Sequence, residues 1–126
     1  IDLRYRAASN GILSNAEDMV KFGSNILNSD YLSEKTKENL WKPIPLYNDI
    51  PSQVSNGWML LIDYRGRKIY GNTSSVHGGS SSIIMYPEEN LIVAFASNLT
   101  GSMDNTPVFE IAMHFLPEEK DEANKE

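Results

Sequence analysis

The chain has no cysteine among its 126 residues, and this absence excludes disulfide bonds and thiolate metal sites. It has only two histidines, and neither has clustered carboxylates beside it, so the sequence indicates no metal site. No apolar run approaches the ~20 residues that a membrane-spanning helix needs. A signal-peptide pattern is also missing, and this absence leaves the cellular compartment open.

Basic residues are few as well. The chain has 11 Lys and Arg against 17 Asp and Glu, a net charge of −6, and no basic patch, so nucleic-acid binding is not expected. Hydrophobic residues make up 40% of the sequence and aromatic residues 10%, which is enough for the core of one domain. We expect this domain to span residues 1–117 and the acidic segment 118–126 to be a flexible tail.

The first half of the sequence predicts two helices and a loop. Apolar residues recur at helical spacing over residues 13–28, and Ser14 with Glu17 three positions on forms a capping-box pattern. Residues 32–41 fit a shorter helix with Ser33 as its cap. The next dozen residues carry three prolines, which predicts an irregular surface loop.

The second half predicts strands and a closing helix. Two strand-like stretches flank the turn sequence at residues 65–67 and predict a hairpin. Strands are expected over residues 74–87 and 91–98, and a helix over 104–116. Both alternate sets of side chains are apolar from residue 91 to 96, which predicts that this strand is covered on both faces. The fold class expected is therefore α+β, an antiparallel sheet flanked by helices.

The candidate chemistry lies around His77. Gly78 and Gly79 remove side chains next to this imidazole, so that a ligand could approach the backbone closely. Ser80 and Ser81 then begin a small, polar stretch before the apolar run starts. A strand that is polar at one end and apolar at the other is typical of a cleft wall. The alternative is that the His-Gly-Gly sequence is only a turn or bulge.

Three stretches in the order found here resemble one enzyme family. They are "AASNGILSNAEDMVKFGSNILN", "NGWMLLID" and "VHGGSSSIIMYPEENLIVAFASN". Together they are similar to the C-terminal portion of the serine beta-lactamases and penicillin-binding proteins. The likeness is greatest to the branch of class C beta-lactamases, D-alanyl-D-alanine carboxypeptidases and related esterases, and it covers Ala7 to about Leu116.

The resemblance implies roles for individual residues. A Lys-Thr-Gly or His-x-Gly motif borders the active site of this family, and His77, Gly78 and Gly79 correspond to it. His77 would bind and polarise the substrate, and the Ser80 amide would supply half of the oxyanion hole. Gly78, Gly79 and Ser81 would contact the substrate. The family cleaves amide or ester bonds through an acyl-enzyme and needs no cofactor.

One family element is missing, because no serine in the chain has a lysine three positions after it. We therefore expect the chain to be the C-terminal half of a larger hydrolase and to be inactive alone. Its partners would be a small-molecule or peptide substrate and the N-terminal half of the same protein, with self-association where that half is absent. The resemblance alone favours an extracytoplasmic location. The alternatives are a non-catalytic binding module of the same fold and an unrelated small α+β binding domain.

Overall fold

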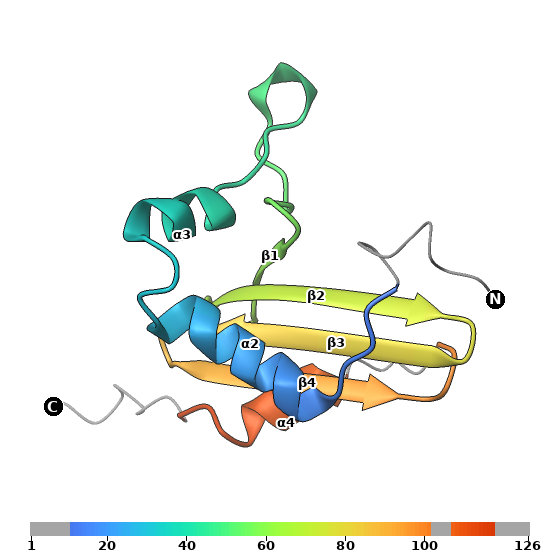
Figure 1. The fold of residues 1–126 in the computed structure, drawn as a ribbon. Helices are drawn as coiled ribbons and strands as arrows, with labels where there is room; N and C mark the ends of the chain where they lie inside the picture. The colour runs from blue at the N-terminus through green and yellow to red at the C-terminus, as the bar shows by residue number, and fades with distance from the viewer. Residues whose placement is uncertain (1–10, 102–106, 118–126) are drawn as a thin grey trace, which may run out of the picture.

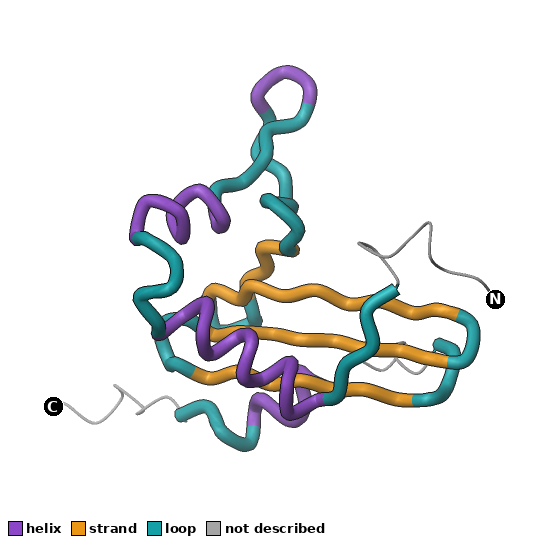
Figure 2. The backbone as a smooth tube through the Cα atoms, viewed as in Figure 1, coloured by secondary structure: helices purple, strands orange, loops and turns teal. Residues whose placement is uncertain are grey.

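The computed structural model describes residues 11–101 and 107–117, so the expectation of a flexible tail over 118–126 lies outside the described residues. Its elements, in chain order, are α2 (Ala16–Asn28), α3 (Glu34–Trp41), the short 3-10 helix η2 (Tyr47–Asp49), β1 (Met59–Ile62), β2 (Lys68–Val76), β3 (Gly79–Tyr86), β4 (Leu91–Ser97) and α4 (Pro107–Met113). Figures 1 and 2 show helices packed around one sheet. The α+β prediction is confirmed.

The four strands form a single antiparallel sheet in the order β1-β2-β3-β4. The predicted hairpin joins β1 to β2, with Met59 opposite Gly71 and Ile62 opposite Lys68. β2 then runs on for five residues beyond its pairing with β1. The sheet is therefore three strands wide at the end where β2 turns into β3.

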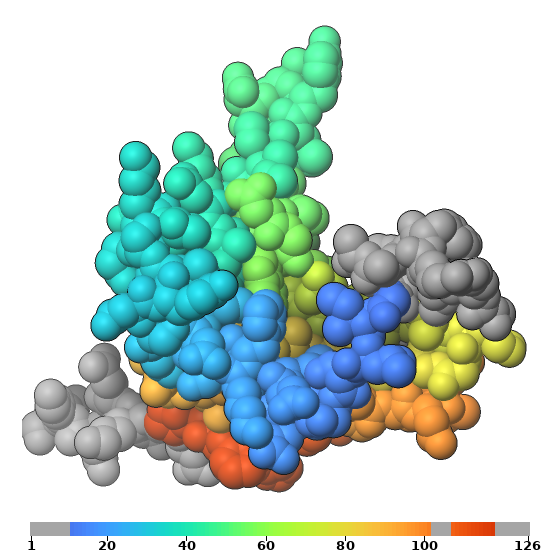
Figure 3. Space-filling view, viewed as in Figure 1, coloured from blue at the N-terminus to red at the C-terminus, as the bar shows by residue number. Residues whose placement is uncertain are grey.

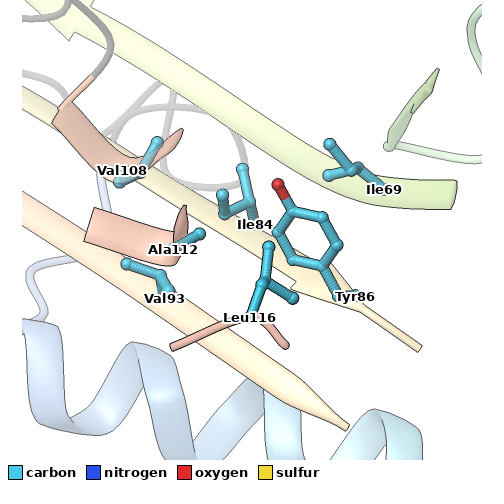
Figure 4. Packing of buried hydrophobic residues seen from close by; sticks show 7 residues of the cluster. All are labelled: Ile69, Ile84, Tyr86, Val93, Val108, Ala112 and Leu116. Atoms are coloured by element: carbon cyan, nitrogen blue, oxygen red, sulfur yellow. The ribbon is translucent and has the colours of Figure 1, made fainter. Parts of the chain in front are cut away.

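Alternating side chains of the strands build two separate apolar layers. On one face, α4 covers a buried cluster that consists of Ile69, Ile84, Tyr86, Val93, Val108, Ala112 and Leu116 (Figure 4). On the other face, α2 and α3 pack over a second buried cluster. It consists of Ile26, which α2 itself contributes, Trp58, Ile83 and Met85. Residues of β4 pack into both layers, so the prediction that this strand is covered on both faces is confirmed.

Helix α2 begins one residue later than the sequence predicts. Asn15 is the cap, because its side-chain oxygen accepts a hydrogen bond of 2.9 Å from the Asp18 amide. The capping box expected from Ser14 is therefore wrong, although the helix itself is confirmed. Asn and Ser are similarly good caps, so local preference could not decide between the two positions. Gly23 lets this helix approach the sheet, since a Cβ there would lie 3.0 Å from Ile92.

Helix α3 has the predicted cap, because the Ser33 hydroxyl accepts a hydrogen bond from the Thr36 amide. At its other end, Trp41 stacks on Tyr70 of β2 with ring centroids 4.1 Å apart, and its ring meets Trp58 edge-on at 5.4 Å. Aromatic pairs in these geometries contribute beyond the area that they bury. Trp41, together with Leu40, thus attaches this helix of eight residues to the sheet.

The proline-containing segment leaves the body of the protein as a narrow arm (Figure 3). Backbone hydrogen bonds from Ile44 to Val54 and from Leu46 to Ile50 close it, both at 2.8 Å. Its tip is η2, where the chain turns through left-handed residues Asn48 and Asp49. Asn and Asp tolerate that conformation better than most residues. The prediction of an irregular loop is correct except for this single 3-10 turn.

The β1–β2 hairpin is held by a buried ion pair. Asp63 accepts hydrogen bonds from the Arg65 amide at 2.9 Å, the Arg67 amide at 2.9 Å and Arg67 Nε at 2.7 Å. The two side chains are only 5% and 12% exposed. Burial raises the pKa of Asp63, but the hydrogen bonds from Arg67 and Arg65 outweigh it, and the net pKa is lowered from its ordinary value.

We expect Asp63→Asn to lower the free energy of unfolding by about 1–3 kcal/mol at neutral pH, because it leaves Arg67 buried without its counter-charge. Since the pKa of Asp63 is lower in the folded state, its stabilising contribution is present above the unfolded pKa of about 4 and is lost as pH falls further. Urea unfolding from pH 7 to pH 3 measures this.

The control is Glu88→Gln, which removes the partner of Lys68 in an ion pair whose side chains are more than 60% exposed. Such pairs contribute little, so the urea midpoint of this variant should equal that of the unmodified protein within error. Equal losses in the two variants would contradict the role assigned to Asp63.

Candidate active site

His77 and Gly78 form the two-residue turn between β2 and β3, because Val76 pairs with Gly79 across it. Gly78 has φ +82°, a conformation that glycine adopts without steric cost. The chain therefore reverses at this point, and the expectation of one strand over residues 74–87 is wrong. The alternative interpretation, that the glycines mark a turn, holds for Gly78.

Gly79 has no such structural reason to be glycine. A Cβ at this position would lie 3.7 Å from both the Ser97 carbonyl oxygen and Val76 Cγ2, which is ordinary van der Waals contact. Its φ is also not among the left-handed values. The missing side chain instead leaves space on the face of the sheet that carries α2, where Gly79 lines a hollow.

This hollow has a volume of about 250 Å³. Ser74, Gly79, Ser81 and Ala96 contribute the sheet side of its wall, and the segment that leads into α2, residues 12–14, contributes the other side. Ile12 and Leu13 in that segment are largely exposed. The hollow is slightly smaller than usual sites for small molecules and combines hydroxyls with apolar side chains.

Ser80 is also among the residues that line the hollow, but its side chain points to the opposite face of the sheet, and the residue is only 5% exposed. Its hydroxyl donates a hydrogen bond of 2.8 Å to the Leu99 carbonyl and lies 3.1 Å from the Ser75 hydroxyl. Ser75 Oγ accepts a hydrogen bond from the Gly101 amide at 3.0 Å. These bonds tie the loop after β4 to the β2–β3 hairpin, so the hydroxyl of Ser80 has a structural role in this fold.

The amide of Ser80 lies within the sheet. Ser80 pairs with Ser75 of β2 on one side and with Ser97 of β4 on the other. Because an antiparallel strand directs its amides toward its neighbours, this placement does not suit the expected oxyanion donor. Among the described residues, two strand edges at this end have no partner. One is that of β2 over residues 73–76, beyond Asn72, whose side chain donates to the Gly57 carbonyl, and the other is that of β4.

His77 is exposed at the tip of the turn and is not among the residues that line the hollow. The Gly78 amide beside it donates a hydrogen bond of 2.8 Å to Thr100 Oγ1, which holds the turn in place. An imidazole that is exposed next to an open strand edge can bind a polar or anionic group. The sequence has no serine followed by lysine at the third position.

Sequence reasoning missed two features of this end of the sheet. One is the open edge of β2, and the other is the pairing of Ser75 with Ser80. The run Asn72–Ser75, which is small and polar, is a usable indication, because such residues at the end of a strand rarely belong to a core. The contact with Thr100 could not have been found, since it joins residues 22 positions apart.

In residues 11–101 and 107–117, no group of three or more His, Cys, Asp or Glu side chains is placed to hold a metal ion. Among the described helices, none is long and apolar enough to cross a membrane.

Comparison with known proteins gives one match. The family model described as Beta-lactamase matches residues 2–112, which is most of the chain. A search of curated proteins and a search of solved structures found no match.

The hydroxyl network makes a testable distinction between two neighbouring serines. Ser80→Ala should lower the free energy of unfolding by about 1–2 kcal/mol, because it leaves the Leu99 carbonyl without its donor. Ser81→Ala, on the opposite face, is the matched control and should change stability by less than about 0.5 kcal/mol. Thermal and urea unfolding compare them, and equal stability of the two variants would contradict the structural role of Ser80.

Proposed function

Because this chain belongs to the beta-lactamase family, we propose that it forms the C-terminal, substrate-binding wall of a serine hydrolase domain. Residues 1–117 would be this part of the domain. The reaction would cleave an amide or ester bond through an acyl-enzyme, as the sequence resemblance implies. The observation that carries the proposal is the open edge of β2, which ends beside an exposed histidine and a serine-lined hollow.

The substrate would lie along residues 73–76 of β2. An extended peptide or an acyl group can pair with a free strand edge through the strand's own amides and carbonyls. Gly79 and Ser81 would contact the substrate from the hollow, and His77 would bind its polar end. An amide of the β2 edge, rather than that of Ser80, is then the better candidate for stabilising a developing oxyanion.

The attacking group would come from polypeptide outside this chain. The family's Ser-x-x-Lys element is not present in the sequence, so the chain alone would bind but not hydrolyse. The substrate classes that the resemblance implies are D-amino-acid peptides, beta-lactams and small esters. The affiliation with the branch of class C beta-lactamases and carboxypeptidases, and an extracytoplasmic location, belong to the same proposal.

The rest of such a domain would add to β4. This strand is the other edge of the described sheet, and it packs apolar side chains into both layers. An edge of this kind favours pairing with another strand. In the absence of the N-terminal half, a second copy of the chain would take its place, which gives self-association.

A second candidate function is a non-catalytic binding module of the same fold. The missing Ser-x-x-Lys element favours it, and the open β2 edge would serve peptide binding equally well. The third interpretation, an unrelated small α+β domain, is wrong, because the family match covers residues 2–112.

Covalent labelling separates the two candidates. The 126-residue chain should stay unlabelled by a fluorophosphonate and by a labelled penicillin, whereas a longer product of the same gene that supplies Ser-x-x-Lys should be labelled at that serine. In the longer protein, His77→Ala should slow labelling about 100-fold, the usual loss for one group that stabilises the transition state. Its melting temperature should not change, because His77 is exposed.

The matched control is His114→Ala, which removes the other histidine, also exposed, at the end of α4. It should label at the unmodified rate. A longer protein that carries Ser-x-x-Lys and labels equally fast with and without His77 would refute the role of His77, and one that never labels would favour the binding module.

Self-association has its own test. Ala96→Lys places a charge on the exposed end of β4 and should shift the chain toward monomer in sedimentation velocity runs. Asn98→Lys adds the same charge just beyond the strand and should leave the distribution unchanged. A chain that is monomeric at all concentrations before any substitution would contradict the proposal for this edge.

A further inference from the structure

A short loop joins the arm to β1 (Figure 2). It contains Asn56 and Gly57, both of which are exposed and lie outside the helices and strands. An asparagine that precedes a glycine is chemically reactive, because the backbone nitrogen of the glycine can attack the side-chain amide carbon of the asparagine. Glycine has no Cβ to obstruct that attack. The loop therefore presents a reactive pair of residues to water.

The space beside Gly57 is open. Its φ is +86°, and a Cβ at this position would meet nothing within 4 Å. The Gly57 amide donates a hydrogen bond of 2.8 Å to the Ser55 carbonyl, a contact within one three-residue turn. The Asn56 side chain donates a hydrogen bond of 2.9 Å to the Asn39 carbonyl. Because this second bond is exposed and neutral, it is open in roughly a tenth of the molecules, and the pair is restrained without being protected.

The same two residues connect separate parts of the fold. Asn56 bonds to Asn39 in α3, and the Gly57 carbonyl accepts a hydrogen bond of 2.7 Å from the Asn72 side chain in β2. Asn72 directly precedes the open edge of β2 over residues 73–76. A chemical change in this loop would therefore reach both the helix α3 and the strand edge.

We propose that Asn56 is a site of spontaneous deamidation, with water as the only co-reactant. The Gly57 nitrogen loses its proton to solvent and attacks Asn56 Cγ, so that a C–N bond forms and Nδ2 leaves as ammonia. The product is a five-membered succinimide ring. Water then opens this ring at one of its two carbonyl carbons and leaves either aspartate or isoaspartate at position 56. No electrons are transferred, so the reaction needs neither an oxidant nor a reductant.

Either product changes the contacts of the loop. A carboxylate cannot donate to the Asn39 carbonyl, so this hydrogen bond is lost and two oxygens face each other. Isoaspartate also routes the backbone through the former side chain, which displaces the Gly57 carbonyl from Asn72. The modification would therefore loosen α3 and release Asn72 beside the β2 edge. The inference rests on this loop alone and does not depend on the proposed hydrolase function.

Peptide mapping by mass spectrometry tests the reaction in the full 126-residue chain, incubated in its folded state at mildly alkaline pH. Asn56 should deamidate at least about tenfold faster than Asn98. Asn98 is the matched control, because it is also exposed in a loop but precedes Leu99. An isoaspartate-specific methyltransferase should label the product at position 56. The other Asn-Gly pair, at residues 10–11, lies in a different tryptic peptide and is measured separately.

Variants separate the reaction from its effect on the fold. Asn56→Gln should stay unmodified, because its longer side chain would have to close a less favourable six-membered ring. Asn56→Asp reproduces one product and should lower the urea midpoint, whereas Asn98→Asp adds the same charge to an exposed loop and should leave it unchanged. Deamidation of Asn56 no faster than that of Asn98, or only after denaturation, would overturn the proposed site. Equal midpoints of the two aspartate variants would overturn its effect on the fold.

Discussion

The burial of β3 on both of its faces is the constraint on which the rest of the structure depends. Ile84 and Tyr86 lie in the layer under α4, whereas Ile83 and Met85, which alternate with them, lie in the layer under α2. A strand with two apolar faces must be covered on both, so helices pack on opposite sides of the sheet. A register slip of one residue would exchange the two layers, and this fixes the pairing with β2 and β4.

The same strand explains why a hollow lies at one end of the sheet. From Gly79 to Ser82 the side chains of β3 become small and polar, so the apolar layers stop there. Hydrogen bonds take over on one face, where Ser80 and Ser75 hold the loop after β4. On the other face, the described residues leave a hollow. Binding chemistry is therefore possible where hydrophobic packing ends.

Local patterns in the sequence predicted most of the elements. The two helices, the first hairpin and the doubly covered strand depend on periodicity and turn residues within a short window, and all four are found. One error lies where two neighbouring residues are equally good helix caps, as with Ser14 and Asn15. The other lies where a glycine can indicate either a turn or space for a ligand, as at Gly78. The serine network depends on contacts across the sheet, which no short window contains.

The two edges of the described sheet differ in composition, and this difference favours different partners. The side chains on both faces of β4 already lie in apolar layers. A strand added to this edge would therefore extend both layers and bury further apolar area. Along residues 73–76 of β2, the side chains are mostly hydroxyls, and an added chain would gain backbone hydrogen bonds but little burial. Because net hydrogen bonds are weak in water, such pairing is readily reversible. The β4 edge thus favours a stably bound strand of polypeptide, and the β2 edge favours a ligand that must be released.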